Sequence, residues 1–191
     1  MGRGALLDDP LQRCNRAFGL ERRHDVGTMT TFSTEPPRWL QSLPGGLING
    51  AINGAIAWSA FADMGRVPLS VDSIASPGVT ALGNAATVAF ALTFIVASIT
   101  FFVFRSAARK SGQAPRTLTE MAYWPTGLGL ALGNTLLVFG AFVAAAVMWQ
   151  RFFGTLLVGP LAGTLVVAAV AAGASGLADW RTKREMLRAA A

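Results

Sequence analysis

The chain has 191 residues, of which 52% are hydrophobic and only 14% are charged. Soluble domains carry about 25% charged residues, so this composition excludes an ordinary soluble domain and indicates a membrane protein. The net charge of +6 would suit a nucleic-acid partner, but the basic residues stand in blocks beside apolar segments, which is a topology signal. The single Cys14 excludes an internal disulfide and a cysteine-rich metal site, and we expect no metal and no nucleic acid.

Residues 1–43 are polar and rich in arginine, and they lack the apolar core of a signal peptide. We expect them to form a cytoplasmic tail. A short interfacial helix is predicted near residues 38–43, because Arg38 and Trp39 suit the headgroup region of a bilayer.

The first predicted span, at about 45–62, has a glycine at every fourth position. Each interior glycine costs a helix in water roughly 1 kcal/mol relative to alanine. In a bilayer, small residues four apart form a flat stripe against which another helix packs closely. Gly46, Gly50 and Gly54 are therefore predicted to hold this helix in the centre of the bundle.

Three further spans are predicted at about 79–104, 126–148 and 155–177, with Pro160 kinking the last one or starting its regular part. About 20 apolar residues cross roughly 30 Å of hydrocarbon. The spans contain no Asp, Glu, Lys, Arg or His in their interiors. The predicted fold is an all-α membrane protein, a four-helix transmembrane bundle over 44–177 followed by a basic cytoplasmic tail at 178–191.

The distribution of lysine and arginine predicts the orientation. Fourteen of the sixteen lie in the N-terminal tail, the loop between the second and third spans and the C-terminal tail. The other two loops hold only Arg66 and Arg151. Positively charged loops stay in the cytoplasm, so both termini are predicted to be cytoplasmic in a bacterial inner membrane. The central loop also contains Thr117-Leu-Thr-Glu120, a spacing that predicts a short surface helix.

Small residues also recur in the third and fourth spans. Packing within the chain accounts for such residues, and a stripe left exposed would favour association with a second copy. The helix-packing residues predicted there are Gly129, Gly133, Gly159 and Gly163.

Asparagines are the most polar side chains in the spans. Asn53 and Asn134 lie at similar depths, about eight residues from the inner boundary, and are predicted to meet. Asn49 is nearer the inner surface, and Asn84 enters from the outer side in another layer. An unpaired amide in hydrocarbon costs several kcal/mol, so Asn49, Asn53 and Asn134 form a possible polar cluster. It serves either as interhelical hydrogen bonding or as a site for a small solute or lipid headgroup.

The chain resembles small four-span bacterial inner-membrane proteins that carry no assigned activity. The resemblance lies in the Asn-Gly-rich first helix through Ala57-Trp58, in Val67-Pro68-Leu69 of the outer loop, and in Arg105 at the end of the second helix. It implies no catalytic or binding residues.

The sequence contains no grouping typical of catalysis, so we expect no enzyme and no cofactor. The first hypothesis is a non-enzymatic multi-pass membrane protein with a structural, accessory or assembly role. Its partners would be the lipid bilayer and a second copy or another membrane protein. The alternative is a small-solute or lipid transporter or channel with an asparagine-lined cavity in its inner half.

Overall fold

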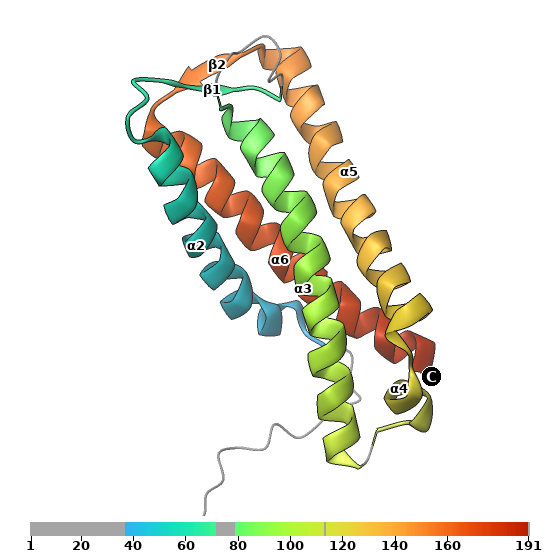
Figure 1. The fold of residues 1–191 in the computed structure, drawn as a ribbon. Coiled ribbons are helices and arrows are strands. Elements are labelled where there is room, and N and C mark those ends of the chain that lie inside the picture. The colour runs from blue at the N-terminus through green and yellow to red at the C-terminus, as the bar shows by residue number, and fades with distance from the viewer. Residues whose placement is uncertain (1–36, 72–78, 113, 191) are drawn as a thin grey trace, which may run out of the picture. The chain divides into compact units, whose positions relative to one another are not determined.

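A computed structural model describes residues 37–71, 79–112 and 114–190, which all lie in one compact unit, Phe32–Ala191. The fold is mostly helical (Figure 1). In chain order its elements are η1 (Trp39–Ser42), α2 (Leu43–Phe61), β1 (Val67–Leu69), α3 (Ala81–Ser111), α4 (Arg116–Glu120), η2 (Tyr123–Gly127), α5 (Leu128–Phe153), β2 (Leu156–Val158) and α6 (Pro160–Ala190).

Helix α6 is the central packing element of this unit. It packs extensively against α2 and α3, and α5 packs mainly against α3 (Figure 1). Helices α2 and α3 make few direct contacts with one another, although both rest on α6. A groove therefore remains between α2 and α3, with α6 as its floor.

Three helices are long and apolar enough to cross a membrane: Ala81–Ser111, Tyr123–Phe153 and Pro160–Ala190, each of 31 residues. At 1.5 Å per residue such a helix is about 46 Å long, which exceeds the roughly 30 Å of hydrocarbon in a bilayer. Helix α2 has only 19 residues and is not among them, because its glycines and asparagines lower its hydropathy. The fold is thus mostly helical, as expected, and in the part of the chain that is described three helices are long and apolar enough to span a membrane.

The long helices begin and end at residues whose chemistry explains the boundaries. The Thr80 hydroxyl caps α3 by accepting a hydrogen bond from the Gly83 amide at 3.2 Å. Gly112, with φ of 66°, ends it. Pro160 starts α6, as one of the two sequence-based alternatives predicted. Helix α6 then continues to Ala190, so the predicted basic tail at 178–191 is helical almost to its end.

A two-stranded antiparallel pairing closes one end of the bundle, which we call the strand end. Val67, Pro68 and Leu69 of β1 pair with Val158, Leu157 and Leu156 of β2. Val67 is fully buried and packs near Phe61 and Gly163. The opposite end, which we call the basic end, carries Arg38, the arginines around α4 and the C-terminal part of α6.

The glycine stripe of α2 faces α6 at close range. A Cβ atom added to Gly46 would lie 2.8 Å from the Ala172 carbonyl oxygen, and one added to Gly50 would lie 2.9 Å from the Ala168 carbonyl oxygen. At Gly54 it would meet the Ala168 Cβ at 3.0 Å. Real Cβ atoms do not approach so closely, so α2 lies against α6 at a distance that only glycine permits.

The other four predicted packing glycines differ in whether another part of the chain covers them. Gly163 is buried, and a Cβ atom there would lie 3.3 Å from the Val67 side chain, so it packs within the chain. Gly129, Gly133 and Gly159 are exposed and have open space at the Cβ position, so they do not pack against another described element of this chain. Their spacing resembles that of α2, but no other element of the described ranges covers the helix faces on which they lie.

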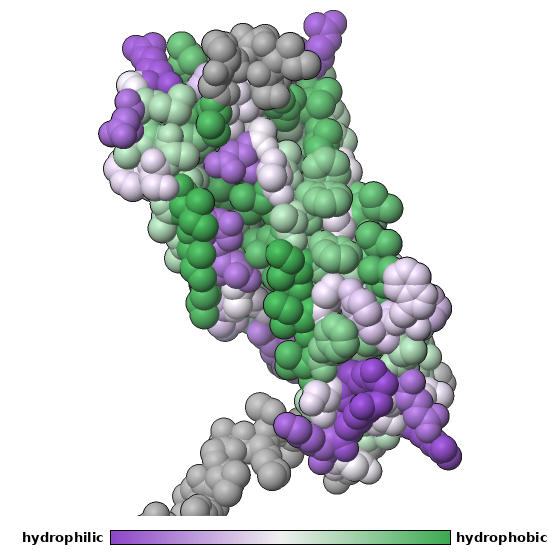
Figure 2. Space-filling model, viewed as in Figure 1, coloured by the Kyte–Doolittle hydropathy of each residue, from purple (hydrophilic) through white to green (hydrophobic). Residues whose placement is uncertain are grey.

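Large hydrophobic side chains cover the outward faces of the long helices. Figure 2 shows hydrophobic atoms along the middle of the visible face and hydrophilic atoms gathered toward the two ends. Hydrophilic atoms also lie in the space between α2 and α3. The face seen in Figure 2 suits contact with lipid except at its ends and in that groove.

Candidate functional site

A cleft of about 260 Å³ lies in the groove between α2 and α3, toward the basic end. Helix α6 supplies its floor. Eight of its nine lining residues are polar or glycine, in contrast to the apolar outer faces of the helices. The residues that line the cleft are Gln41, Ser42, Gly45, Gly46, Asn49, Val96, Ser175, Asp179 and Lys183.

Asp179 connects the elements that line this cleft through hydrogen bonds of its carboxylate. Its Oδ2 accepts hydrogen bonds from the Ser42 hydroxyl at 2.6 Å and from the Lys183 ammonium at 2.7 Å. Its Oδ1 accepts one from the Thr100 hydroxyl at 2.8 Å. One carboxylate therefore joins the start of α2, the middle of α3 and the floor helix α6.

Local sequence explains how these groups come to face the cleft. Ser175, Asp179 and Lys183 are four residues apart on α6, so they share one helix face. The Ser175 hydroxyl donates back to the Ala171 carbonyl oxygen at 2.8 Å, as serine commonly does in a helix interior. Gly45 leaves open space where a side chain would stand, which keeps the cleft open.

Asn49 contributes an amide to the cleft wall. It is half-buried, and its side chain makes no hydrogen bond with any residue of the described ranges. An amide without a partner in an apolar medium costs about 1–3 kcal/mol by protein mutational data. The cleft therefore presents a polar group that a polar ligand or water would satisfy.

The predicted meeting of Asn53 and Asn134 does not occur. The Asn53 amide nitrogen donates to the backbone oxygen of Asn49 on its own helix at 2.9 Å. Asn134 instead joins α5 to α6: its Nδ2 donates to the Thr182 hydroxyl at 3.0 Å, and its Oδ1 accepts from the Arg181 Nε at 3.1 Å. Equal depth did not bring the two asparagines together, because α2 and α5 contact different parts of the bundle.

A second cavity, of about 490 Å³, lies between α2 and α3 toward the strand end. Asn84 lines it, as do Thr80 and Thr87. The Thr87 hydroxyl donates to the Gly83 carbonyl oxygen at 3.2 Å, so it is already satisfied within α3. The groove between these helices thus holds one cavity in each half.

Sequence reasoning missed Asp179, because it placed that residue in the C-terminal tail beyond the last span. The signal available was the four-residue spacing of Ser175, Asp179 and Lys183, which marks a polar face that continues the helix.

Within residues 37–71, 79–112 and 114–190, no group of three His, Cys, Asp or Glu residues could hold a metal ion.

Comparison of the chain with protein-family models, with curated proteins and with solved structures finds no match. The candidate site is therefore assigned from its own geometry.

Proposed function

We propose that the chain is a non-enzymatic multi-pass protein of a bacterial plasma membrane, with α2, α3, α5 and α6 all crossing the bilayer and both termini in the cytoplasm. The composition of α2 does not contradict this. Its glycines face α6, and its outward face carries Ile48, Ile52 and Ile56, which are 61%, 53% and 60% exposed. This isoleucine row would contact lipid. The orientation follows the concentration of arginine and lysine at the basic end.

The orientation is tested with single cysteines in a Cys14→Ser background. Asp63→Cys, at the strand end, is expected to react with a membrane-impermeant maleimide in intact cells. Lys110→Cys, on the exposed last turn of α3, is expected to react only in inverted vesicles. Labelling of Lys110→Cys but not of Asp63→Cys in intact cells would reverse the orientation, and labelling of both variants would show that α3 does not cross the bilayer.

We further propose that the cleft between α2 and α3 receives a small neutral or zwitterionic polar group, carried by a free solute or by a lipid headgroup. The observation that carries this proposal is the lateral polar cleft, in which the unpaired amide of Asn49 lies beside the Asp179–Lys183 ion pair. The opposite charges of that pair cancel, so the cleft favours a ligand without net charge. Since both Asp179 oxygens are already engaged, the carboxylate is suited to orienting a ligand rather than to moving protons.

Transport is tested in liposomes that contain the purified protein. Flux of urea, glycerol and glycine would report passage of a solute, and dithionite quenching of NBD-labelled phosphatidylcholine would report movement of a headgroup. We expect one of these signals to exceed that of protein-free liposomes. Gly45→Trp should return it to the protein-free level, because Gly45 lines the cleft and has open space at its Cβ position.

Leu47→Trp is the matched control for Gly45→Trp. Leu47 lies two residues away, is 65% exposed and does not line the cleft, so the same added ring should leave the signal unchanged. If neither solutes nor lipid move faster than in protein-free liposomes, transport through the cleft is wrong.

An accessory or assembly role is the second candidate, and the exposed glycines of α5 favour it. Gly129, Gly133 and Gly140 have nothing within 4 Å of an added Cβ atom. In a membrane, exposed small residues permit close packing of another helix. This candidate takes precedence if both liposome assays are negative.

A further inference from the structure

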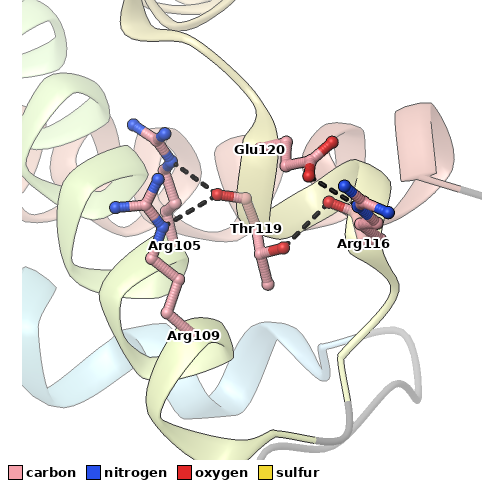
Figure 3. A network of polar contacts seen from close by, with 5 residues as sticks. All are labelled: Arg105, Arg109, Arg116, Thr119 and Glu120. Atoms are coloured by element: carbon pink, nitrogen blue, oxygen red, sulfur yellow. Dashed lines mark hydrogen bonds and ion pairs between the residues drawn. The ribbon is translucent and has the colours of Figure 1, made fainter.

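Two arginines of α3 converge on one acceptor at the basic end (Figure 3). The Arg105 Nε donates to the Thr119 carbonyl oxygen at 3.2 Å, and the Arg109 Nε donates to the same oxygen at 2.8 Å. Because a single oxygen accepts both bonds, the two guanidinium groups lie close to one another. Figure 3 shows the remaining nitrogens of both groups directed away from Thr119.

No carboxylate among the described residues neutralises this pair. The acid closest in sequence to Thr119 is Glu120, whose carboxylate is bound to Arg116 at 2.6 Å (Figure 3). Neither Arg105 nor Arg109 takes part in an ion pair within the described ranges. Two like charges held side by side repel each other, and an anion that contacts both would remove that repulsion. Guanidinium groups bind the oxygens of phosphate with two parallel hydrogen bonds.

An apolar, outward-facing surface adjoins the arginine pair on the same helix. Phe102, three residues before Arg105, is 50% exposed and stacks on the Tyr123 ring with a centroid separation of 4.7 Å. Ile99 and Ile95 continue this surface toward the strand end, at 56% and 50% exposure. Along α3 the order is therefore apolar surface, aromatic pair and arginine pair, which matches the acyl chains, interface and phosphate of a phospholipid.

We propose that Arg105 and Arg109 bind the phosphate of an anionic phospholipid whose acyl chains lie along the exposed face of α3. The occupant is a lipid rather than a soluble phosphate, since the apolar surface leads directly to the arginines. Basic groups at the cytoplasmic ends of membrane helices hold anionic headgroups in this manner. This site rests on the proposed membrane placement of α3 but not on transport through the cleft, which lies between α2 and α3.

The test measures binding of short-chain phosphatidylglycerol to the purified full-length protein in a non-ionic detergent, by microscale thermophoresis. We expect saturable binding to the wild type. Arg105→Gln with Arg109→Gln should weaken it by about tenfold or more, the scale expected when charge-assisted hydrogen bonds are lost. Arg105→Lys with Arg109→Lys keeps both charges but removes the forked geometry, and it should also weaken binding.

The matched control is Arg38→Gln with Lys110→Gln, which removes two positive charges from the same end and leaves the Arg116–Glu120 ion pair intact. It should bind phosphatidylglycerol as the wild type does. Equal losses in the control and in the glutamine variant would indicate diffuse charge attraction and would overturn the site. Unchanged binding by both the glutamine and the lysine variants would do the same.

Inorganic phosphate and short-chain phosphatidylcholine separate the possible sources of the phosphate. Neither should compete at the concentrations at which phosphatidylglycerol saturates the protein. Competition by inorganic phosphate alone would assign the arginine pair to a soluble anion and defeat the lipid proposal. Loss of phosphatidylglycerol binding with liposome flux intact, or the reverse, distinguishes failure at this site from failure at the cleft.

Discussion

Replacing Gly50 with leucine is expected to detach α2 from α6 and to give the largest loss of stability of any single substitution considered. The new Cβ atom alone would stand 2.9 Å from the Ala168 carbonyl oxygen and 2.9 Å from the Ala172 Cβ. A backbone oxygen in a helix cannot move aside as a flexible side chain does, so the helices must separate. Overpacking of this kind costs about 1–3 kcal/mol, and we expect the upper part of that range. Unfolding in a titration with sodium dodecyl sulfate measures the change.

Gly133→Leu is the control for Gly50→Leu. Gly133 also lies within a long apolar helix, but it is exposed and an added Cβ atom meets nothing. The same substitution there should leave the unfolding midpoint almost unchanged, or raise it slightly, because leucine favours the helix over glycine. Equal stability of the two variants would show that the glycine face of α2 does not pack against α6.

Truncating Asp179 to alanine is expected to have the second largest effect. The Ser42 and Thr100 hydroxyls and the Lys183 ammonium would lose their shared acceptor. Ser42 and Thr100 are only 4% and 7% exposed, so water replaces the lost carboxylate poorly. Leaving buried donors unpaired costs about 1–3 kcal/mol, and the start of α2 should loosen from α3. Unfolding in detergent and proteolysis near Ser42 report these two effects.

Glu185→Ala provides the comparison for Asp179→Ala on the same helix. Its carboxylate pairs with Arg188 at 2.9 Å near the end of α6, where the two side chains are 30% and 57% exposed. Such exposed pairs contribute about 0–1 kcal/mol. Asp179→Asn keeps an acceptor and should fall between the wild type and Asp179→Ala. If Glu185→Ala destabilises the protein as much as Asp179→Ala, the carboxylate of Asp179 does not join the three helices.

The features that depend on sequence spacing could be predicted. The four-residue repeat of Gly46, Gly50 and Gly54 sets one helix face, and the structure places another helix directly on it. The start of α6 at Pro160 follows from local residue preferences in the same way. The short helix α4 forms where the Thr117–Glu120 spacing suggested one, but it begins at Arg116 and no side chain caps it. Each of these features requires knowledge of only a few neighbouring residues.

The site could not be predicted, because it depends on which helices are neighbours. Height along a helix follows from 1.5 Å per residue, and it suggested that Asn53 and Asn134 would meet. Lateral position is set by tertiary packing, which placed Asn134 against Thr182 instead. The partnership of Ser42 with Asp179 likewise joins residues 137 positions apart in the chain. The β1–β2 pairing was missed because three-residue strands are too short to show a period-two pattern.

The dependence of α2 on α6 has a consequence for the order in which the protein is built. Helix α2 leaves the ribosome first among the proposed spans. The residues that pack against its glycine face, Ala168 and Ala172, belong to the last helix. At about 5–20 residues per second, synthesis needs on the order of ten seconds to reach that partner. During this interval the amides of Asn49 and Asn53 have no packed helix beside them, and lipid is a poor solvent for them. If all four helices cross the bilayer as proposed, the first of them to be translated is therefore the last to reach its final packed position, because that position requires α6.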